Sequence, residues 1–118
     1  MLQLNHKKLD VWKEGVNLVK LIYKITESFP KSELFGLNSQ LRRASVSVVS
    51  NIAEGASRKT KAERIRFYEI SRGSLVEIDT QIEIAIELNY LTKDNISLLE
   101  ANIIRIFSML SNLIRNCV

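Results

Sequence analysis

The sequence predicts an all-α protein that folds as one antiparallel up-down four-helix bundle, and three observations support this. The chain has 118 residues, and 46% of them are hydrophobic, which is enough for one domain with a core and too little for two. It contains four Gly and one Pro, so few positions suit the tight turns of a β protein. Its apolar residues recur every three or four positions in four segments, which is the period of an amphipathic helix.

The first predicted helix covers residues 7–28. It ends before Pro30, the only proline, because a proline ring interrupts helical hydrogen bonding. Its expected core face consists of Leu9, Trp12, Val16, Val19, Ile22 and Tyr23.

The second predicted helix covers residues 38–55. Asn38 is its expected N-cap and Gly55 its expected C-terminal stop, because these residue types favour the two ends of a helix. Its expected core face consists of Leu41, Ala44, Val48 and Ile52.

The third predicted helix covers residues 61–89 and the fourth residues 93–116. Thr60 and Glu63 have the spacing of a capping box, and Thr92 is the expected cap of the fourth helix. Because the connections are short, successive helices are expected to be antiparallel neighbours in one domain, residues 1–118. The expected core residues are Tyr68, Leu75, Ile78, Ile82 and Ala85 on the third helix, and Ile96, Leu99, Ile103, Ile106, Leu110 and Leu113 on the fourth.

A second apolar seam on the third helix predicts self-association. At 100° per residue, its members lie well away from the core face, so a single subunit leaves them in water. Gly73 costs about 1 kcal/mol relative to Ala in mid-helix, and its place on the seam suggests close approach by a neighbour. Scattered apolar surface residues are the alternative. The candidate oligomer interface consists of Val46, Val49, Ala53, Ile70, Gly73, Glu77, Ile84 and Leu88; Gln81 shares the seam, and Ile104 and Phe107 widen the apolar stripe of the fourth helix.

The charges are sorted along the chain and favour an anionic partner. The 17 Lys and Arg against 13 Asp and Glu give a net charge of +4 and a pI of about 9.4. Cations concentrate in residues 57–72, where a predicted helix N-terminus adds positive potential, and acids concentrate in residues 73–100. Such a surface suits the phosphate backbone rather than base readout. The candidate nucleic-acid-binding residues are Arg42, Arg43, Arg58, Lys59, Lys61, Arg64, Arg66 and Arg72.

The sequence contains no catalytic constellation and predicts a protein that is not an enzyme. His6 and Cys117 are the only His and Cys, which excludes a nucleophile–base pair, a zinc site and an intrachain disulfide. The glycines are isolated rather than grouped in a phosphate-binding loop, so no cofactor or metal is expected. The first ten residues lack the apolar core of a signal peptide, and no segment has the uninterrupted apolar length of a membrane span. We therefore expect a cytoplasmic protein with no membrane partner.

Five motifs occur in order along nearly the whole chain. They are LDVWK at residues 9–13, FP followed by ELFGL within 29–37, QLRRA at 40–44, SNIAEG at 50–55 and GSLVE at 73–77. Together they resemble the family of small four-helix-bundle proteins named after 23S ribosomal RNA intervening sequences, once labelled S23 ribosomal proteins. Gly15 stands where the family more usually has alanine, and Ser45 and Ser47 make the second helix more polar; neither change conflicts with the fold.

The resemblance implies an antiparallel four-helix bundle that assembles into a homopentamer. The chain is also similar to the accessory proteins of diversity-generating retroelements, which form pentameric barrels and work with nucleic acid and a reverse transcriptase, so a reverse transcriptase is a candidate partner. Arg42 and Arg43 match the family's paired arginines, and Arg58 matches a basic residue after its NIAEG motif. Asn51 and Glu54 are expected to shape the bundle and its contacts rather than to perform chemistry.

Two functions follow as expectations. The first is a non-enzymatic oligomer that binds RNA or other nucleic acid through phosphate contacts. The second is a homo-oligomeric scaffold for protein–protein contacts with no nucleic-acid ligand. Pairing of Arg42 and Arg43 with carboxylates such as Glu54 or Glu77 in the assembly would favour the second. No residue singles out a third role, a toxin-like or antitoxin-like regulator.

Overall fold

The computed structural model describes residues 1–118 apart from the side chain of Lys8, and over these residues it contains four α-helices and no β-strand. The all-α class predicted from the sequence is therefore confirmed. The helices are α1 (Asp10–Thr26), α2 (Leu37–Ser57), α3 (Lys61–Glu87) and α4 (Ser97–Arg115), with 3-10 turns η1 (Asn5–Lys8), η2 (Lys31–Glu33) and η3 (Lys93–Ile96).

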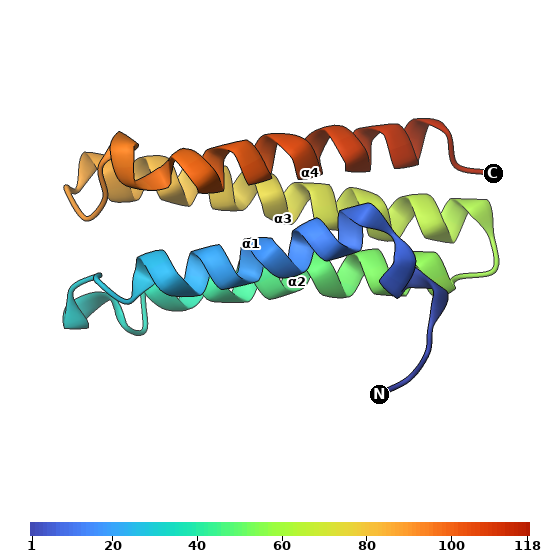
Figure 1. Ribbon diagram of the computed structural model, residues 1–118, viewed down its shortest axis with the longest axis horizontal. Helices are drawn as coiled ribbons and strands as arrows, with labels where there is room; N and C mark the ends of the chain where they lie inside the picture. Colours follow the sequence, from blue (N-terminus) through green and yellow to red (C-terminus); the bar gives the residue numbers. More distant parts are fainter.

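The four helices lie side by side along the longest dimension of a molecule that measures 43 × 28 × 20 Å (Figure 1). Contacts join α1 to α2, α2 to α3, α3 to α4 and α4 back to α1, so the helices surround one core. The α2–α3 connection and both chain ends lie at one end of the molecule, and the other two connections lie at the opposite end.

The core faces of three helices agree with the sequence pattern. Every predicted core residue of α2 and α3 is buried. In the fourth predicted helix, Ile103 and Leu113 pack against the core while partly exposed, and the other predicted residues are buried. The helical period was enough to predict these three core faces, because their core positions keep a regular spacing of three and four residues.

The predicted core face of α1 is right only in part. Ile22 is buried and Leu9 and Trp12 pack against the core while partly exposed, but Tyr23 is exposed and the buried face is rotated relative to the expected stripe. Two small or polar residues decide the orientation. A Cβ added to Gly15 would lie 3.1 Å from Cγ2 of Val49 on α2, which leaves little room for any side chain. The Thr26 hydroxyl donates to the carbonyl of Ile22 at 2.7 Å, which allows it to be buried. The buried residues of α1 are Val11, Gly15, Leu18, Ile22 and Thr26.

Helix α2 begins at Leu37, so Asn38 is not the N-cap that the sequence predicts. Glu33 takes this role from the preceding turn, where its Oε1 accepts a hydrogen bond from the Leu37 amide at 3.1 Å. Asn38 is buried, and its side-chain amide donates to the carbonyl of Thr26 at 3.0 Å. The asparagine therefore ties α2 to the end of α1.

Gly55 is not the C-terminal stop that the sequence predicts, because α2 continues to Ser57. Gly55 is buried against α3, where an added Cβ would lie 2.7 Å from Cε1 of Tyr68 and 3.2 Å from Cβ of Phe67. Its φ is not positive, so conformational freedom is not the reason for glycine here. The residue allows two helices to approach closely.

The predicted Thr60 cap of α3 is confirmed, whereas Thr92 caps the turn η3 and not α4. The Thr60 hydroxyl accepts a hydrogen bond from the Glu63 amide at 3.2 Å, at the start of α3. The Thr92 hydroxyl accepts one from the Asn95 amide at 3.3 Å. Thr92 opens the turn η3, and α4 begins only at Ser97.

Polar contacts tie the sequence-distant elements together. Asn102 is buried on α4, and its amide donates to the Glu14 carbonyl at 3.1 Å and to Glu14 Oε2 at 2.8 Å. Arg105 reaches the same carboxylate oxygen at 3.4 Å. At the end of the molecule that holds the α3–α4 connection, the Tyr90 hydroxyl donates to Oε2 of Glu33 at 2.9 Å. These bonds join α4 to α1 and the α3–α4 connection to η2.

The segment Lys93–Arg115 is long and apolar enough to cross a membrane by length and composition. A core helix of a water-soluble protein has the same profile. Ile106 and Leu110 are fully buried in the bundle, and the buried polar Asn102 faces α1. These contacts account for the buried third of its most apolar window.

Replacing Gly55 with alanine should destabilise the subunit by about 1 to 2 kcal/mol. The added Cβ collides with the buried Tyr68 ring, and overpacking of about 1 to 3 kcal/mol exceeds the gain in helix propensity of about 1 kcal/mol. Gly73→Ala is the matched control, since no atom lies within 4 Å of its added Cβ. It should raise the subunit's own stability by about 0.5 to 1 kcal/mol. Urea unfolding measures both changes, and equal effects would contradict the packing role of Gly55.

The bond from Tyr90 to Glu33 should make stability depend on pH in the alkaline range. Glu33 accepts the phenolic hydrogen bond and raises the pKa of Tyr90 above its ordinary value of 10.0. This stabilising contribution is complete below pH 10 and is lost as the pH rises through the raised pKa of the folded state. Glu33→Gln should lower the tyrosinate midpoint in an ultraviolet titration, with Tyr90→Phe identifying the signal. An unchanged midpoint in Glu33→Gln would contradict the assignment.

Candidate nucleic-acid interface

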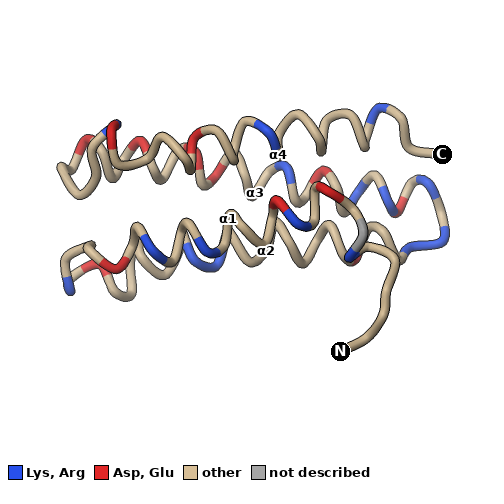
Figure 2. The backbone as a smooth tube through the Cα atoms, viewed as in Figure 1, with Lys and Arg blue, Asp and Glu red and all other residues tan. Residues whose placement is uncertain are grey.

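The predicted phosphate-binding residues fall into separate groups on the structure (Figure 2). Arg42 and Arg43 lie on α2 (Leu37–Ser57), about 21 to 23 Å along the helix axis from its C-terminal end at a rise of 1.5 Å per residue. Arg72 lies further along α3 than the rest. The remaining five surround the α2–α3 connection, and we call them the basic end: Arg58, Lys59, Lys61, Arg64 and Arg66. A single subunit therefore does not bring all eight predicted residues together.

Two arginines of the basic end stack on one aromatic ring. The guanidinium of Arg58 lies 4.7 Å from the ring centre of Phe67, and that of Arg66 lies 5.8 Å from it. Arg58 also forms an ion pair with Glu54 at 2.9 Å. Both partners of that pair are exposed, so it contributes little to stability. The ring and the carboxylate fix where the guanidinium of Arg58 lies.

Arg64 closes the α2–α3 connection. Its Nη1 donates to the carbonyls of Arg58 and Lys59 at 3.1 and 3.0 Å, and its Nη2 donates to the carbonyl of Val118 at the chain end. The Arg64 guanidinium therefore binds backbone carbonyls of the connection and of the chain end.

Burial raises the pKa of the neighbouring Tyr68, the Cys117 thiol adds to this effect, and Arg64 partly offsets it.

Three cations of the basic end, Lys59, Lys61 and Arg66, have exposed side chains. Within the described part of the chain, no carboxylate lies within ion-pair distance of any of them. Their positions follow the start of α3, where amide groups without intrahelical acceptors add positive potential.

Arg42 caps the end of α1 instead of projecting into solvent. Its Nε donates to the hydroxyl of Thr26 at 2.9 Å, its Nη2 donates to the carbonyl of Tyr23 at 3.3 Å, and its guanidinium lies 4.5 Å from the ring centre of Tyr23. A cation at a helix C-terminus is stabilised by the carbonyl dipoles there. Arg43 is exposed. In the described residues of one subunit, neither arginine pairs with a carboxylate.

Arg72 contacts α4. Its Nη1 donates to the hydroxyl of Ser111 at 3.2 Å, and its guanidinium lies 5.9 Å from the ring centre of Phe107. The side chain is half-buried. It therefore supports the α3–α4 contact.

Most of the predicted oligomer interface lies on the surface of the subunit. Val46, Ile70, Ile84 and Leu88 keep 41 to 49% of their surface exposed, and no atom lies within 4 Å of a Cβ added to Gly73. The seam is thus open in one subunit, as a contact between copies requires.

Other residues of the predicted interface and of the seam, Glu77 among them, have contacts inside the subunit. Val49 packs beside Gly15 of α1. Gln81 is buried between α2 and α3, where its Nε2 donates to Gln40 Oε1 and to Glu77 Oε1, both at 3.2 Å. Ala53 of α2 is half-buried.

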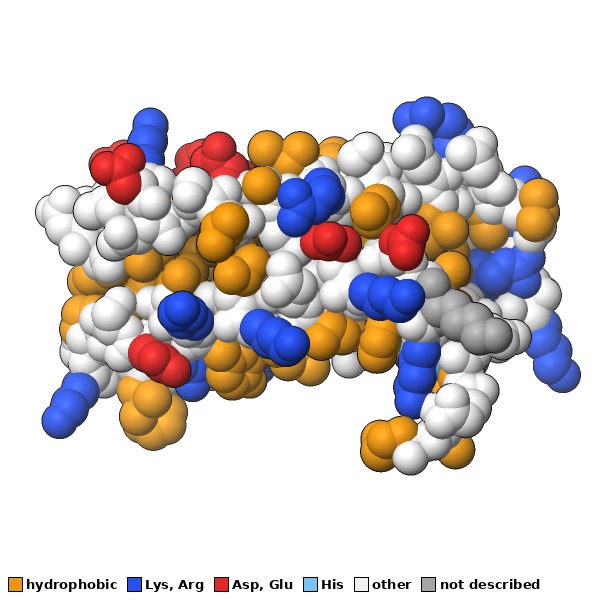
Figure 3. Space-filling view, in the orientation of Figure 1, with side chains coloured by type: hydrophobic (Ala, Val, Ile, Leu, Met, Phe, Trp, Pro, Cys, Tyr) orange, Lys and Arg blue, Asp and Glu red, His pale blue; other side chains and the backbone are white. Residues whose placement is uncertain are grey.

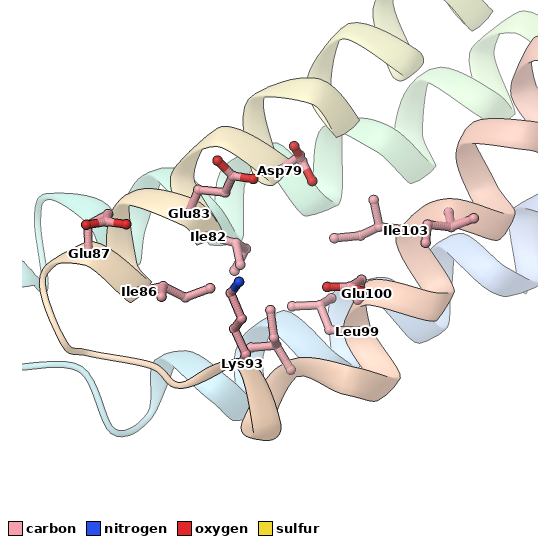
Figure 4. Close-up of a pocket in the computed structure, with 11 residues that line it drawn as sticks. Asp79, Ile82, Glu83, Ile86, Glu87, Lys93, Leu99, Glu100 and Ile103 are labelled. Atoms are coloured by element: carbon pink, nitrogen blue, oxygen red, sulfur yellow. The ribbon is translucent and has the colours of Figure 1, made fainter.

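The structure also places a groove between α3 and α4 that the sequence pattern did not predict (Figure 4). It consists of two adjoining clefts of about 570 and about 360 Å³, which share Asp79, Ile103 and Ile104. We call it the α3–α4 groove. The carboxylates that line it come from the acidic segment noted in the sequence, but only the pairing of two helices brings them to one groove: Asp79, Glu83, Glu87 and Glu100.

The described residues contain no cluster of three or more His, Cys, Asp or Glu side chains that could hold a metal ion.

Comparison with known proteins gives a family and a fold. The family model described as 23S rRNA-intervening sequence protein matches residues 7–112. A crystal structure of a protein with unknown function from the S23 ribosomal protein family of Bacteroides thetaiotaomicron VPI-5482 superposes with a TM-score of 0.82 at 19% sequence identity, over 90% of this chain and 96% of that chain. No curated protein matches. Since the family model spans most of the sequence, the chain belongs to the 23S rRNA-intervening sequence protein family.

Proposed function

We propose that this protein is a cytoplasmic, non-enzymatic oligomer that binds RNA through phosphate contacts at its basic end. The observation that carries the proposal is the set of exposed cations Lys59, Lys61 and Arg66, which have no carboxylate partner in the described part of the subunit. A phosphate backbone supplies the missing negative charge, and such contacts dominate nucleic-acid affinity. The family's description, which refers to an rRNA-intervening sequence, favours RNA over other polyanions.

The other two cations of the basic end, Arg58 and Arg64, have partners inside the subunit that hold them and the connection in place. Arg64 binds the carbonyls of the α2–α3 connection, and Arg58 is held by Glu54 and the ring of Phe67. A connection that is already ordered loses less conformational entropy when a ligand binds. The free cations are therefore presented from a fixed backbone.

The proposed assembly is a homopentamer of antiparallel up-down four-helix bundles, in which the seam on α3 contacts a neighbour. The exposed apolar residues and the open backbone at Gly73 support this contact. Symmetry repeats each basic end in every copy. Linked weak sites raise the effective concentration of the polyanion, so five modest contacts give useful affinity.

Removing the free cations should weaken RNA binding and its salt dependence. We expect the triple variant Lys59→Ala, Lys61→Ala, Arg66→Ala to lose at least about tenfold in affinity for structured RNA at low salt. The slope of log affinity against log salt should fall by about one for each lost phosphate contact per bound subunit. Fluorescence titration over a series of salt concentrations measures both quantities.

The matched control removes three exposed lysines at the opposite end of the molecule, with the same change in charge: Lys24→Ala, Lys31→Ala, Lys93→Ala. It should keep nearly the full salt slope. Equal losses in both variants would show that net charge alone attracts RNA. Absence of binding by the native protein at low salt would refute the RNA proposal.

A charge placed in the seam should disrupt the assembly. Ile84→Asp puts a carboxylate where the proposal buries an apolar side chain, so the solution mass should shift from about five subunits toward one. Leu98→Asp on α4, at a residue that is 75% exposed and outside the seam, is the control and should keep the native mass. Analytical ultracentrifugation at micromolar concentration decides, and a native protein of one subunit would contradict self-association.

The second candidate function is a homo-oligomeric scaffold without a nucleic-acid ligand. The observation that favours it is that Arg42, Arg58, Arg64 and Arg72 all have partners inside the subunit. Under this function the native mass stays oligomeric, and RNA binding is absent at low salt.

A further inference from the structure

The α3–α4 groove combines an apolar floor with an acidic rim. Its floor includes Leu75 and Ile82, which belong to the core. Exposed apolar side chains border it, with 52% of Val76, 62% of Ile104 and 43% of Phe107 accessible. Apolar side chains gathered in this way mark a site of interaction in soluble proteins.

The groove is negative although the whole protein is positive. It is lined by four carboxylates and a single cation, Lys93, whose ammonium group points toward Ile82 (Figure 4), whereas the chain carries a net charge of +4. None of these charged groups has an ion-pair partner among the side chains that the structure describes. Figure 3 shows acidic and apolar side chains next to each other along the upper edge, toward the end that holds the α3–α4 connection. This surface attracts a cationic occupant and repels a phosphate backbone.

The shape of the groove suits a helix. On α3 the lining residues recur every three or four positions from Leu75 to Glu87, a stretch of about 18 Å at 1.5 Å per residue. On α4 they recur in the same way from Leu99 to Phe107. A third helix of about twelve residues, or just over three turns, fills this length. Its apolar side chains must recur at the same spacing to reach the floor, as they do when an amphipathic helix binds in a groove.

The basic surfaces of the subunit itself do not match this description. On α1, the exposed position between Lys13 and Lys20 is the polar Asn17. At the basic end, no large apolar side chain within residues 57–69 is exposed. The seam is apolar, but it includes the exposed Glu77, whose charge has the same sign as that of the groove. The occupant that combines apolar side chains with several cations is therefore a segment of another protein.

We propose that the α3–α4 groove binds a basic amphipathic helix of a partner protein. The apolar face of that helix packs on Ile82, Ile103 and Phe107, and its lysine or arginine side chains pair with the carboxylates of the rim. Lys93 opposes the binding, because it is the one positive charge that the occupant meets in the groove. The inference adds a protein-binding site to the RNA-binding surface proposed above, and it does not depend on self-association.

A synthetic helix tests the contact. The probe is a fluorescein-labelled, end-capped peptide of about fourteen residues, or about four turns, made of leucine and lysine with all leucines on one helical face. Fluorescence anisotropy measures its binding to the native protein. A peptide of the same composition, with leucines distributed around the helix, should bind at least about fivefold more weakly. Absence of binding at low salt, or equal affinities for the two peptides, would overturn the proposal.

Charge variants locate the site of binding. Removing three carboxylates of the groove by Glu83→Gln, Glu87→Gln and Glu100→Gln should weaken the binding of the amphipathic peptide at least about tenfold. The matched control makes the same change of charge at exposed acids outside the groove and should keep the affinity within about twofold. Equal losses would show that net charge alone attracts the peptide, and the proposal would be wrong. The control substitutions are Glu27→Gln, Glu63→Gln and Glu69→Gln.

Two single variants give effects of opposite sign. Lys93→Gln should strengthen peptide binding by about two- to fivefold, whereas Lys31→Gln, at an exposed lysine outside the groove, should not. Ile104→Ser should weaken binding at least about fivefold. Its control is Leu98→Ser, at a residue of α4 that is 75% exposed and does not line the groove. An affinity that Lys93→Gln fails to raise, or that Ile104→Ser fails to lower, would overturn the proposal.

The solution mass distinguishes a partner protein from a second copy as the occupant. Ile104→Asp should keep the native mass, because here no subunit occupies the groove of another. A shift toward one subunit would show that the groove is an interface between copies, and the partner helix would be excluded. A native protein that is a single subunit, or that does not bind RNA, contradicts the function proposed above and leaves peptide binding in the groove as a separate result.

Discussion

The close contact between α2 and α3 is the constraint on which the rest of the structure depends. Gly55 admits the Tyr68 ring, the hydroxyls of Ser47 and Ser74 lie 3.0 Å apart, and the buried hydroxyl of Ser71 donates to the carbonyl of Val48 at 2.7 Å. Small side chains let the two backbones approach, and the serine hydroxyls find partners as they are buried. This pairing holds the α2–α3 connection, and with it the basic end, in one place.

The same pairing leaves α3 with more apolar surface than the bundle covers. One flank of the helix carries the seam with Ile70 and Ile84, and the other carries Val76 beside the α3–α4 groove. Both flanks remain open because each helix in a ring of four touches two neighbours and turns its outer side to water. The open apolar surface of the seam is what the proposed self-association uses.

The basic side chains fall into two groups: arginines that bind other parts of the subunit, and lysines that remain exposed. Arg42 holds the end of α1, Arg64 holds the α2–α3 connection, and Arg72 supports the contact with α4. An arginine has five donors in a planar fork, so it satisfies several backbone or hydroxyl acceptors at once. The lysines of the basic end, Lys59 and Lys61, are left exposed, and the proposed RNA contact uses their charge.

The sequence by itself determined the helical class, the core faces of α2, α3 and α4, the Thr60 cap and the segregation of charge, because all of these are local or periodic properties. Only the tertiary structure decided the face of α1, where the fit of Gly15 against Val49 outweighed the apolar stripe. It also decided the role of Gly55 and the division of the arginines, because a partner such as the Thr26 hydroxyl for Arg42 lies sixteen positions away in the chain. The tertiary structure also decided the α3–α4 groove. Its acidic residues are visible in the sequence, but a groove exists only where two helices meet.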